Sequence, residues 1–210
     1  IPREQGGVLY IPSVFFGLNG EVLDKKTPLL RSLRRIHEAA SELISCFRSR
    51  PARIRNMVGP EQEFFLVDES RYRERPDLAT LGRVMFAARP PRGQQMGDHY
   101  FGRIPERVLT YLEEVDRLCI RLGIPLKTRH NEVAPNQFEV APLYEEANIA
   151  VDHNQILMDL LQDTARRHGL VCLLHEKPFA CFNGSGKHLN WSLMEDAGRN
   201  LLMPGSNRAS

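Results

Sequence analysis

The chain has 210 residues, 42% of them hydrophobic and 26% charged, which is ordinary for a globular protein long enough to bury a sizeable core. A formal net charge of +2 gives no case for nucleic-acid binding, and the arginines at 31, 34–35 and 166–167 are interpreted as solvated helix faces. No apolar run predicts a membrane span or a signal peptide, so we expect a cytoplasmic protein, with an organelle as the alternative.

The first part of the chain predicts a hairpin and then a helix. Residues 7–23 are rich in β-branched and aromatic side chains, and a glycine-containing turn at 17–20 divides them. Thr27 and Pro28 then offer an N-cap and a proline in the first helical turn. Apolar residues follow at helical spacing and predict a helix that ends near residues 50–51.

The next part predicts a buried strand, a long loop and a second helix. Residues 58–68 read as a strand whose second half, residues 64–67, is apolar on both faces and therefore central in a sheet. Residues 70–104 hold many Arg, Pro and Gly without a sustained period, which predicts a long functional loop with short helical pieces. A helix is predicted to begin at Pro105 and to stop at Gly123.

The last part alternates extended and helical segments. Residues 127–132 and 137–141 look extended around a turn at residues 135–136. A third helix is predicted over about residues 146–168, and residues 170–174 form a buried strand that leads to a glycine-rich loop. The fold class predicted from these segments is mixed α+β.

Two glutamates begin the predicted central strand. Glu61 and Glu63 are two residues apart, so their side chains share one face of the strand while Gln62 faces the other way. Like charges this close repel unless a cation lies between them or one is protonated, and a bound divalent ion resolves the conflict. The alternative is an exposed strand start with two solvated carboxylates.

A second pair of glutamates flanks the predicted turn. Glu132 and Glu139 are seven residues apart, which on one straight strand sends them to opposite faces. The turn breaks that parity, so the two carboxylates can converge. Each alone is more typical of a surface glutamate, but together with Glu61 and Glu63 they predict a carboxylate cluster.

The glycine-rich loop, residues 183–188, has the sequence NGSGKH and superficially resembles a Walker A loop. It fails that pattern, because Cys181 stands where the first glycine belongs and His188 where Ser or Thr would hold magnesium. What remains is backbone that can approach a ligand closely and one imidazole; the alternative is a plain Asn-Gly turn beside a surface histidine.

The type of side chain indicates which metal the cluster would prefer. Carboxylates with one imidazole and no thiolate favour magnesium or manganese over zinc or copper, and such ions commonly bridge nucleotide phosphates. Among the other histidines, His153 lies on the inward stripe of its predicted helix and is interpreted as a core residue. Spacing alone assigns no role to His99, His130 or His175.

Several motifs follow one another in a single order along the chain. They are residues 59–68 (GPEQEFFLVD), 127–139 (KTRHNEVAPNQFE), 175–179 (HEKPF) and 183–188 (NGSGKH), with further likeness at residues 24–31 and 98–102. Together these segments resemble glutamine synthetase, most closely its type III branch. The likeness runs from about residue 8 to residue 205.

The resemblance implies ATP-dependent ligation of ammonia to L-glutamate through a γ-glutamyl phosphate, with ATP as co-substrate and two or more Mg²⁺ or Mn²⁺ ions in each site. It implies a mainly antiparallel curved sheet that forms part of an active-site barrel, with flanking helices. By motif, the catalytic residues are metal ligands: Glu63, Glu132 and Glu139 on the glutamate side, and Glu61 and His188 on the ATP side. Asn183 and Gly184 would contact glutamate, and Ser192 the nucleotide.

The chain also departs from the family pattern. Type I enzymes have histidine where Asn190 stands, and Cys181 and Leu189 differ from the expected loop. From the resemblance we expect further ligands and arginines of the family to follow the point where this chain ends, and we expect the amino-terminal domain to be missing from these residues. We therefore expect residues 1–210 to be a partial catalytic domain that is inactive by itself, from a protein that forms a homo-oligomeric ring, a dodecamer. The rivals are a related carboxylate-amine ligase and a non-catalytic structural or regulatory descendant.

Overall fold

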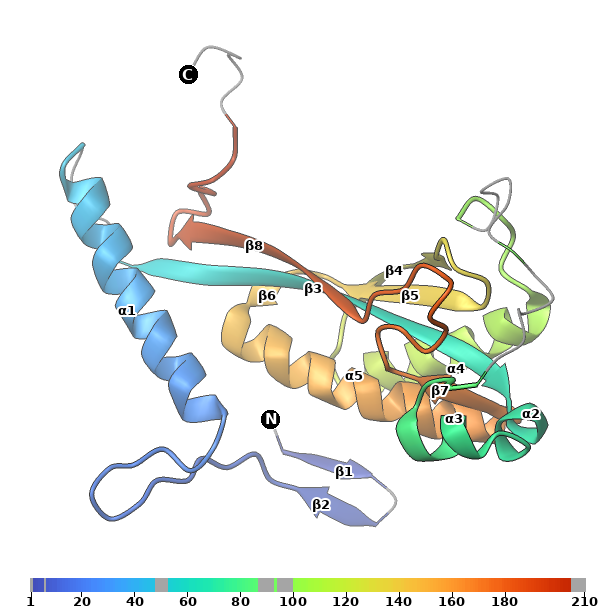
Figure 1. Ribbon diagram of the computed structural model, residues 1–210. Coiled ribbons are helices and arrows are strands. Elements are labelled where there is room, and N and C mark those ends of the chain that lie inside the picture. The colour runs from blue at the N-terminus through green and yellow to red at the C-terminus, as the bar shows by residue number, and fades with distance from the viewer. Residues whose placement is uncertain (1, 6, 48–52, 87–92, 94–99, 205–210) are drawn as a thin grey trace. The chain divides into compact units, whose positions relative to one another are not determined.

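The computed structural model describes residues 2–5, 7–47, 53–86, 93 and 100–204 (Figure 1). These residues divide into two compact units. One comprises residues 59–143 and 153–190, and the other comprises residues 1–58, 144–152 and 191–210. The predicted helix end at residues 50–51, the motif residues 98–99 and the last six residues lie outside the described part of the chain.

The first unit is built on an antiparallel sheet around a long central strand. Strand β3 (Ile54–Asp68) pairs antiparallel with β5 (Gln137–Pro142) and β7 (Leu170–Leu173), and β4 (Leu126–Asn131) extends the sheet beyond β5. Strand β8 (Lys187–Glu195), which the sequence analysis did not predict, also pairs with β3. The central position predicted for residues 64–67 is confirmed.

Two long helices cover one face of this sheet (Figure 1). Helix α4 (Glu106–Arg121) and helix α5 (Ala147–Arg167) agree with the predicted helices within one or two residues. Their buried side chains, Tyr111 and Leu157 among them, pack with Phe64 of β3 in the main core cluster. Burying a side chain of this size stabilises the fold by roughly 2 kcal/mol, so this face of the sheet is fixed by packing.

The segment after β3 contains two short helices, as predicted. Helix α2 (Glu69–Arg73) and helix α3 (Pro76–Leu81) pack through Leu78 and Tyr72 into a small second cluster on Phe65. This cluster occupies the other face of β3, because neighbouring residues of a strand point to opposite sides.

The second unit contains a long helix and a short hairpin. Helix α1 spans Lys26–Ser45, and β6 (Glu145–Glu146) pairs with the first part of β3. The predicted hairpin over residues 7–23 was largely wrong: the ladder joins β1 (Arg3–Gln5) to β2 (Val8–Tyr10), and a single bridge from Phe16 to Val22 spans the predicted turn.

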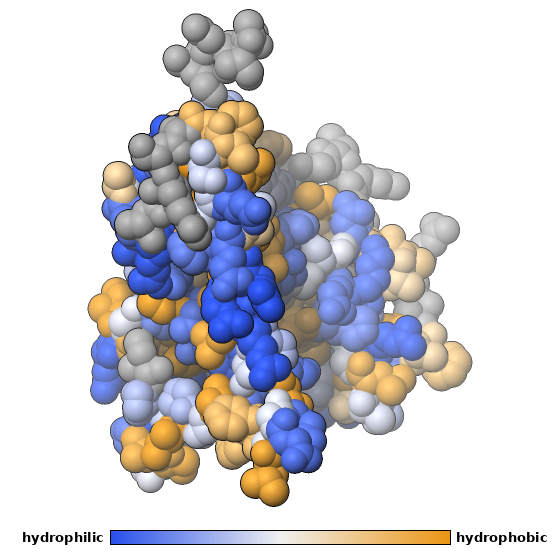
Figure 2. All heavy atoms as spheres, turned by 90° about the vertical axis from the view of Figure 1, so that its left-hand side faces the viewer, coloured by the Kyte–Doolittle hydropathy of each residue, from blue (hydrophilic) through white to orange (hydrophobic). Residues whose placement is uncertain are grey.

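The surface of this second unit is hydrophilic along α1 and apolar near the preceding loop. Figure 2 shows a hydrophilic band with apolar side chains gathered below it. Phe15, Phe16 and Leu18 are among the exposed apolar residues of this loop. Among the residues that the structure describes, no helix is both long and apolar enough to reach across a bilayer.

Candidate active site

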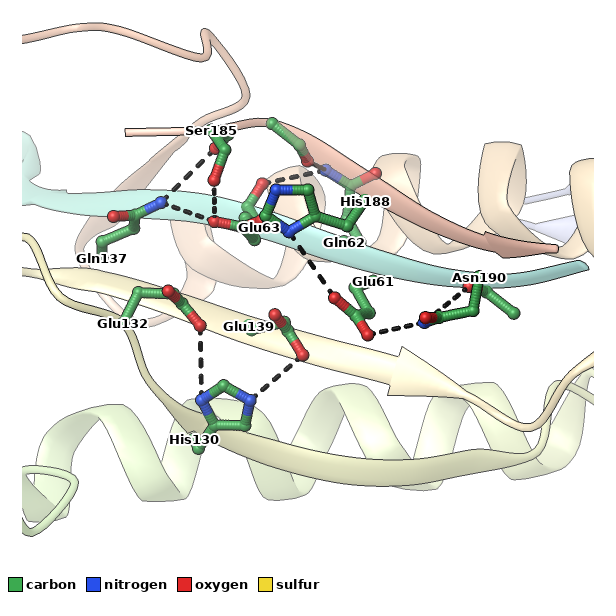
Figure 3. A network of polar contacts seen from close by, with 12 residues as sticks. Glu61, Gln62, Glu63, His130, Glu132, Gln137, Glu139, Ser185, His188 and Asn190 are labelled. Carbon is green, nitrogen blue, oxygen red and sulfur yellow. Dashed lines mark hydrogen bonds and ion pairs between the residues drawn. The ribbon is translucent and has the colours of Figure 1, made fainter. Parts of the chain in front are cut away.

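The candidate active site lies on the sheet face opposite α4 and α5. The strand register places Glu63 of β3 directly opposite Glu139 of β5, and Glu139 directly opposite His130 of β4. Side chains in directly opposite positions lie on the same face, about 5 Å apart at Cβ. Two carboxylates and an imidazole therefore form one row across three strands (Figure 3).

His130 joins the two glutamates that flank the turn. Its Nε2 lies 3.1 Å from Oε1 of Glu139, and its Nδ1 lies 3.4 Å from Oε1 of Glu132. The turn between them includes Asn136 with φ of 58°, and the amide of Glu132 donates to the carbonyl of Gln137 at 2.9 Å. The predicted convergence of Glu132 and Glu139 is confirmed, since ligand atoms of both and of His130 lie within 4.8 Å of one another.

The protonation of these three groups reflects their burial and mutual charge. Burial raises the pKa of Glu139 to about 7; the charges of Glu61, Glu132 and Glu63 add to this rise, and His130 opposes it. Burial also raises the pKa of Glu132, with the charge of Glu63 next in size.

The ring of His130 partly offsets the negative charge of Glu132 and Glu139. Burial alone would lower the pKa of His130, but the hydrogen bond to the carbonyl of Asn131 and the charges of Glu139 and Glu132 raise it. Because a carbonyl only accepts, Nδ1 donates to Asn131, and Nε2 and Oε1 of Glu139 must share at least one proton to attract each other. When no cation is bound, a proton between Nε2 of His130 and Oε1 of Glu139 allows the two atoms to lie this close.

Glu63 is fully buried and held by neutral donors. Its side chain is 0% exposed, and its Oε2 accepts hydrogen bonds from Nε2 of Gln137 at 2.8 Å and from the hydroxyl of Ser185. Its Oε1 lies 2.9 Å from Nδ1 of His188 but accepts no aligned hydrogen bond, although it is shielded from water. The alternative reading, a strand start with solvated carboxylates, is therefore wrong for this residue, because the loop carrying Ser185 covers it.

Glu61 lies one step along the same face of β3. Its Oε2 is 3.6 Å from Nδ1 of His188, and its Oε1 accepts a hydrogen bond of 2.6 Å from Nδ2 of Asn190 (Figure 3). Strand β8 supplies both partners, since residues 188 and 190 are two apart and share a face. His188 thus stands between the two glutamates predicted to share a cation.

The glycine-rich loop reaches the site through Ser185. Gly184, the preceding residue, packs so closely that a side-chain carbon there would overlap the carbonyl oxygen of Glu176. Glycine is required at this position because backbone approaches backbone. Asn183 is exposed beside it. Ser192 belongs to the second unit, where its hydroxyl donates to Asn200.

Five site residues were given no role by sequence reasoning. Four of them contact the carboxylates directly: His130, Gln137, Ser185 and Asn190. The fifth is Tyr100, whose ring centroid lies 5.2 Å from that of His130. The charge of Glu132 is the main cause of the raised pKa of Tyr100. No local signal in the sequence could have placed His130 at the site, because its position depends on how β4 pairs with β5, and a shift of one residue would turn it to the other face.

The arrangement of donors fits a hard divalent cation. Glu61, Glu63, Glu132 and Glu139 present carboxylate oxygens to one face of the sheet, and Oε1 of Glu63 is buried without an aligned donor. Carboxylate oxygens with an imidazole and no thiolate are ligands of Mg²⁺ or Mn²⁺. A cation here would offset the repulsion that raises the pKa of Glu132 and Glu139.

Comparisons with known proteins show which family this chain resembles. Residues 45–210 match the model of the glutamine synthetase catalytic domain, and residues 1–32 match that of the glutamine synthetase type III N terminal. A type-3 glutamine synthetase of Dictyostelium discoideum is 55% identical over 98% of this chain and 28% of its own length. A glutamine synthetase of Bacteroides fragilis (strain YCH46) is 51% identical over 95% of this chain and 27% of its own.

The fold is found in solved structures as well. A structure described as "GmaS/ADP complex-Conformation 1" matches with a TM-score of 0.62 over 86% of this chain and 36% of its own, at 24% sequence identity. This chain spans less than a third of the length of the two curated relatives. The α+β fold with a mainly antiparallel curved sheet, expected from the sequence, is that of the glutamine synthetase catalytic domain. The chain belongs to the glutamine synthetase family, in its type III branch.

Proposed function

We propose that the protein to which this chain belongs ligates ammonia to L-glutamate at the expense of ATP and releases glutamine. The observation that carries the proposal is the convergence of Glu63, Glu132, Glu139 and His188 on one face of the sheet in a chain of this family. Family membership implies the use of a divalent metal and ATP. We assign residues 45–210 to part of the catalytic domain and residues 1–32 to the type III N-terminal region, as the two family models match them.

In this proposal the carboxylates form two metal-binding sets. Glu63, Glu132 and Glu139 hold the ion nearer glutamate and ammonia, while Glu61 and His188 hold the ion on the ATP phosphates. The ions would be Mg²⁺ or Mn²⁺, which when bound would neutralise phosphate charge and favour attack of the glutamate carboxylate on the γ-phosphorus of ATP, with ADP as the leaving group. Ammonia would then displace phosphate from the γ-glutamyl phosphate and lose a proton to give glutamine.

The other residues bind and orient the substrates. Asn183 and the backbone of Gly184 contact glutamate. The hydrogen bond from Ser185 to Glu63 supports this assignment, because it holds the loop beside the carboxylate cluster. Ser192 contacts the nucleotide. Gln137 orients the Glu63 carboxylate through its hydrogen bond to Oε2, so that Oε1 stays available as a ligand.

We further propose that the protein is cytoplasmic and forms a homo-oligomeric ring of twelve subunits, as its family resemblance implies. Analytical ultracentrifugation of the complete protein tests the ring. A mass of about twelve subunits is expected, and a monomer at all concentrations would contradict the assignment. Fractionation of the source cells tests the compartment, and recovery of the protein in an organelle or membrane pellet would contradict a cytoplasmic location.

Product analysis with the complete protein tests the activity. With glutamate, ammonia, ATP and Mg²⁺, glutamine and ADP should form in equal amounts. Glu63→Gln should lower the rate by more than about 100-fold because a buried ligand is lost, whereas Glu113→Gln, an exposed change on α4, should not alter it. Turnover of another amine or acid in place of ammonia or glutamate would favour the related-ligase alternative. A folded protein that turns over none of these would favour the non-catalytic one.

A further inference from the structure

Two buried amide side chains link the sheet, helix α5 and the glycine-rich loop. Gln62 of β3 is 2% exposed and faces away from the carboxylates, and Asn154 of α5 is 3% exposed. Neither takes part in the function proposed above. Buried polar side chains cost free energy unless they are hydrogen-bonded, so their partners indicate what they do.

The partners of Gln62 include the loop that leads to His188. Nε2 of Gln62 donates to the carbonyl oxygens of Gly186 and of Glu63, each at 2.9 Å. The amide nitrogen of Glu63 donates to the same Gly186 oxygen at 3.1 Å. Two donors from β3 therefore hold this one carbonyl, which lies two residues before His188.

Asn154 sets the direction of the Gln62 amide. Two carbonyl oxygens can only accept, so Nε2 must face them and Oε1 of Gln62 must face α5. There Nδ2 of Asn154 donates to Oε1 at 3.1 Å. The reverse orientation would bring Oε1 of Gln62 against the carbonyl of Gly186, which costs the full penalty of unsatisfied buried groups.

His188 depends on this backbone for its place. Its side chain is 66% exposed, whereas Glu63 beside it is 0% exposed. A side chain that is mostly in solvent gains little orientation from packing, so the path of the backbone decides where its imidazole lies. The carbonyl of Gly186 anchors this backbone just before strand β8 begins at Lys187 and carries His188.

We propose that Gln62 and Asn154 are positioning residues, which fix the carbonyl of Gly186 and thereby hold His188 beside Glu61 and Glu63. The inference rests on the proposed function in that His188 binds a cation there. Its rival is a structural role only, in which the two amides stabilise the interior of the unit without any effect on the loop.

The variants for the test remove one feature each in the complete protein. Gln62→Met keeps the length of the side chain and removes the donor. Asn154→Asp replaces the donor with an acceptor, which should turn the Gln62 amide and set Oε1 against Gly186. Leu66→Met is the control, because Leu66 shares the buried face of β3 and lies in the main core cluster.

Three readouts separate positioning from stability: the melting temperature, hydrogen–deuterium exchange of the Glu63 amide and of residues 185–190, and Mn²⁺ affinity. Both amide variants should speed this exchange by at least about tenfold relative to the β5 amides. They should weaken Mn²⁺ binding by about 10- to 100-fold. Leu66→Met should change neither. A lower melting temperature with unchanged loop exchange and Mn²⁺ affinity would overturn the inference.

Two further arms keep the test decisive. If Gln62→Met does not fold, Asn154→Asp should still disturb the loop more than Asn154→Leu, and equal effects would overturn the proposal. If the wild-type protein makes no glutamine but the variants still lose Mn²⁺ and loop protection, the proposed function fails and the positioning role stands. Wild-type glutamine formation with no such loss refutes the positioning role alone.

Discussion

Glu139 is the site carboxylate whose neutralisation should stabilise the metal-free protein. The change is Glu139→Gln, which keeps the shape of the side chain and removes its charge. Glu139 is 6% exposed and directly opposite Glu63 on the sheet. A buried carboxylate that faces another carboxylate disfavours its own ionised form, so the substitution removes a cost that the folded protein bears at high pH.

The size of this cost follows from the pKa of Glu139, which burial raises from 4.5 to about 7. Because the folded protein holds this proton more tightly than the unfolded chain, stability falls as pH rises from 4.5 to about 7, and the full penalty applies above pH 7. At about 1.4 kcal/mol per pH unit, the substitution should raise the free energy of unfolding by about 3 kcal/mol at pH 8 and by less than about 1 kcal/mol at pH 5.

Urea unfolding of the complete protein in the presence of a chelator measures both values. Glu113→Gln on the exposed side of α4 is the matched control and should change the free energy of unfolding by less than about 0.5 kcal/mol at either pH. With saturating Mn²⁺ at pH 8, the wild type should be more stable than Glu139→Gln, because the ion stabilises the wild type and Glu139→Gln lacks one of its ligands. Equal or lower stability of Glu139→Gln at pH 8 without metal would show that the ionised Glu139 carboxylate does not destabilise the folded protein.

Two other predictions concern the scaffold and the loop. Glu114→Gln should destabilise the protein by about 1 kcal/mol at pH 7, since His168 donates to this carboxylate at 2.7 Å and is the main cause of its lowered pKa. The difference should vanish as the pH falls below the normal range of a glutamate, and urea unfolding that shows the same difference at pH 3 would count against it. Gly184→Ala should displace the loop and cut activity at least tenfold, because the added carbon meets the backbone oxygen of Glu176. In Gly186→Ala, the closest atom to the added carbon would be Cγ of Glu176, at 2.9 Å, and this flexible side chain can move. Gly186→Ala should therefore lose less activity than Gly184→Ala, and equal rates for both variants would contradict the steric argument.

The helices and the central strand were predictable because their signals are local. Helices α4 and α5 each carry an apolar stripe at helical spacing and end at a glycine with positive φ, 78° at Gly123 and 64° at Gly169. The first hairpin was predicted in the wrong place, because Arg3–Gln5 has no β-branched or aromatic side chain to indicate a strand. Strand β8 carries five exposed residues of mixed polarity at its start, so no alternation indicated it.

Some features of the candidate site were likewise predictable from local signals, and others were not. The shared face of Glu61 and Glu63 follows from their spacing alone, and the turn indicated that Glu132 and Glu139 converge. The position of His130 depends on how β4 pairs with β5, and a pairing register between strands is not a local property of either one. The same holds for Asn190, whose contact with Glu61 depends on a strand far away in sequence.

The number of cations bound per chain shows whether the carboxylates and His188 form a two-metal site. Manganese titration of the complete protein, followed by electron paramagnetic resonance of the free ion, gives this number. The wild type should bind at least two ions, with one fewer in His188→Ala and one fewer in Glu132→Gln, because each variant removes a ligand of a different ion. An unchanged number in both folded variants, or no saturable binding to the folded wild type, would contradict a two-metal site.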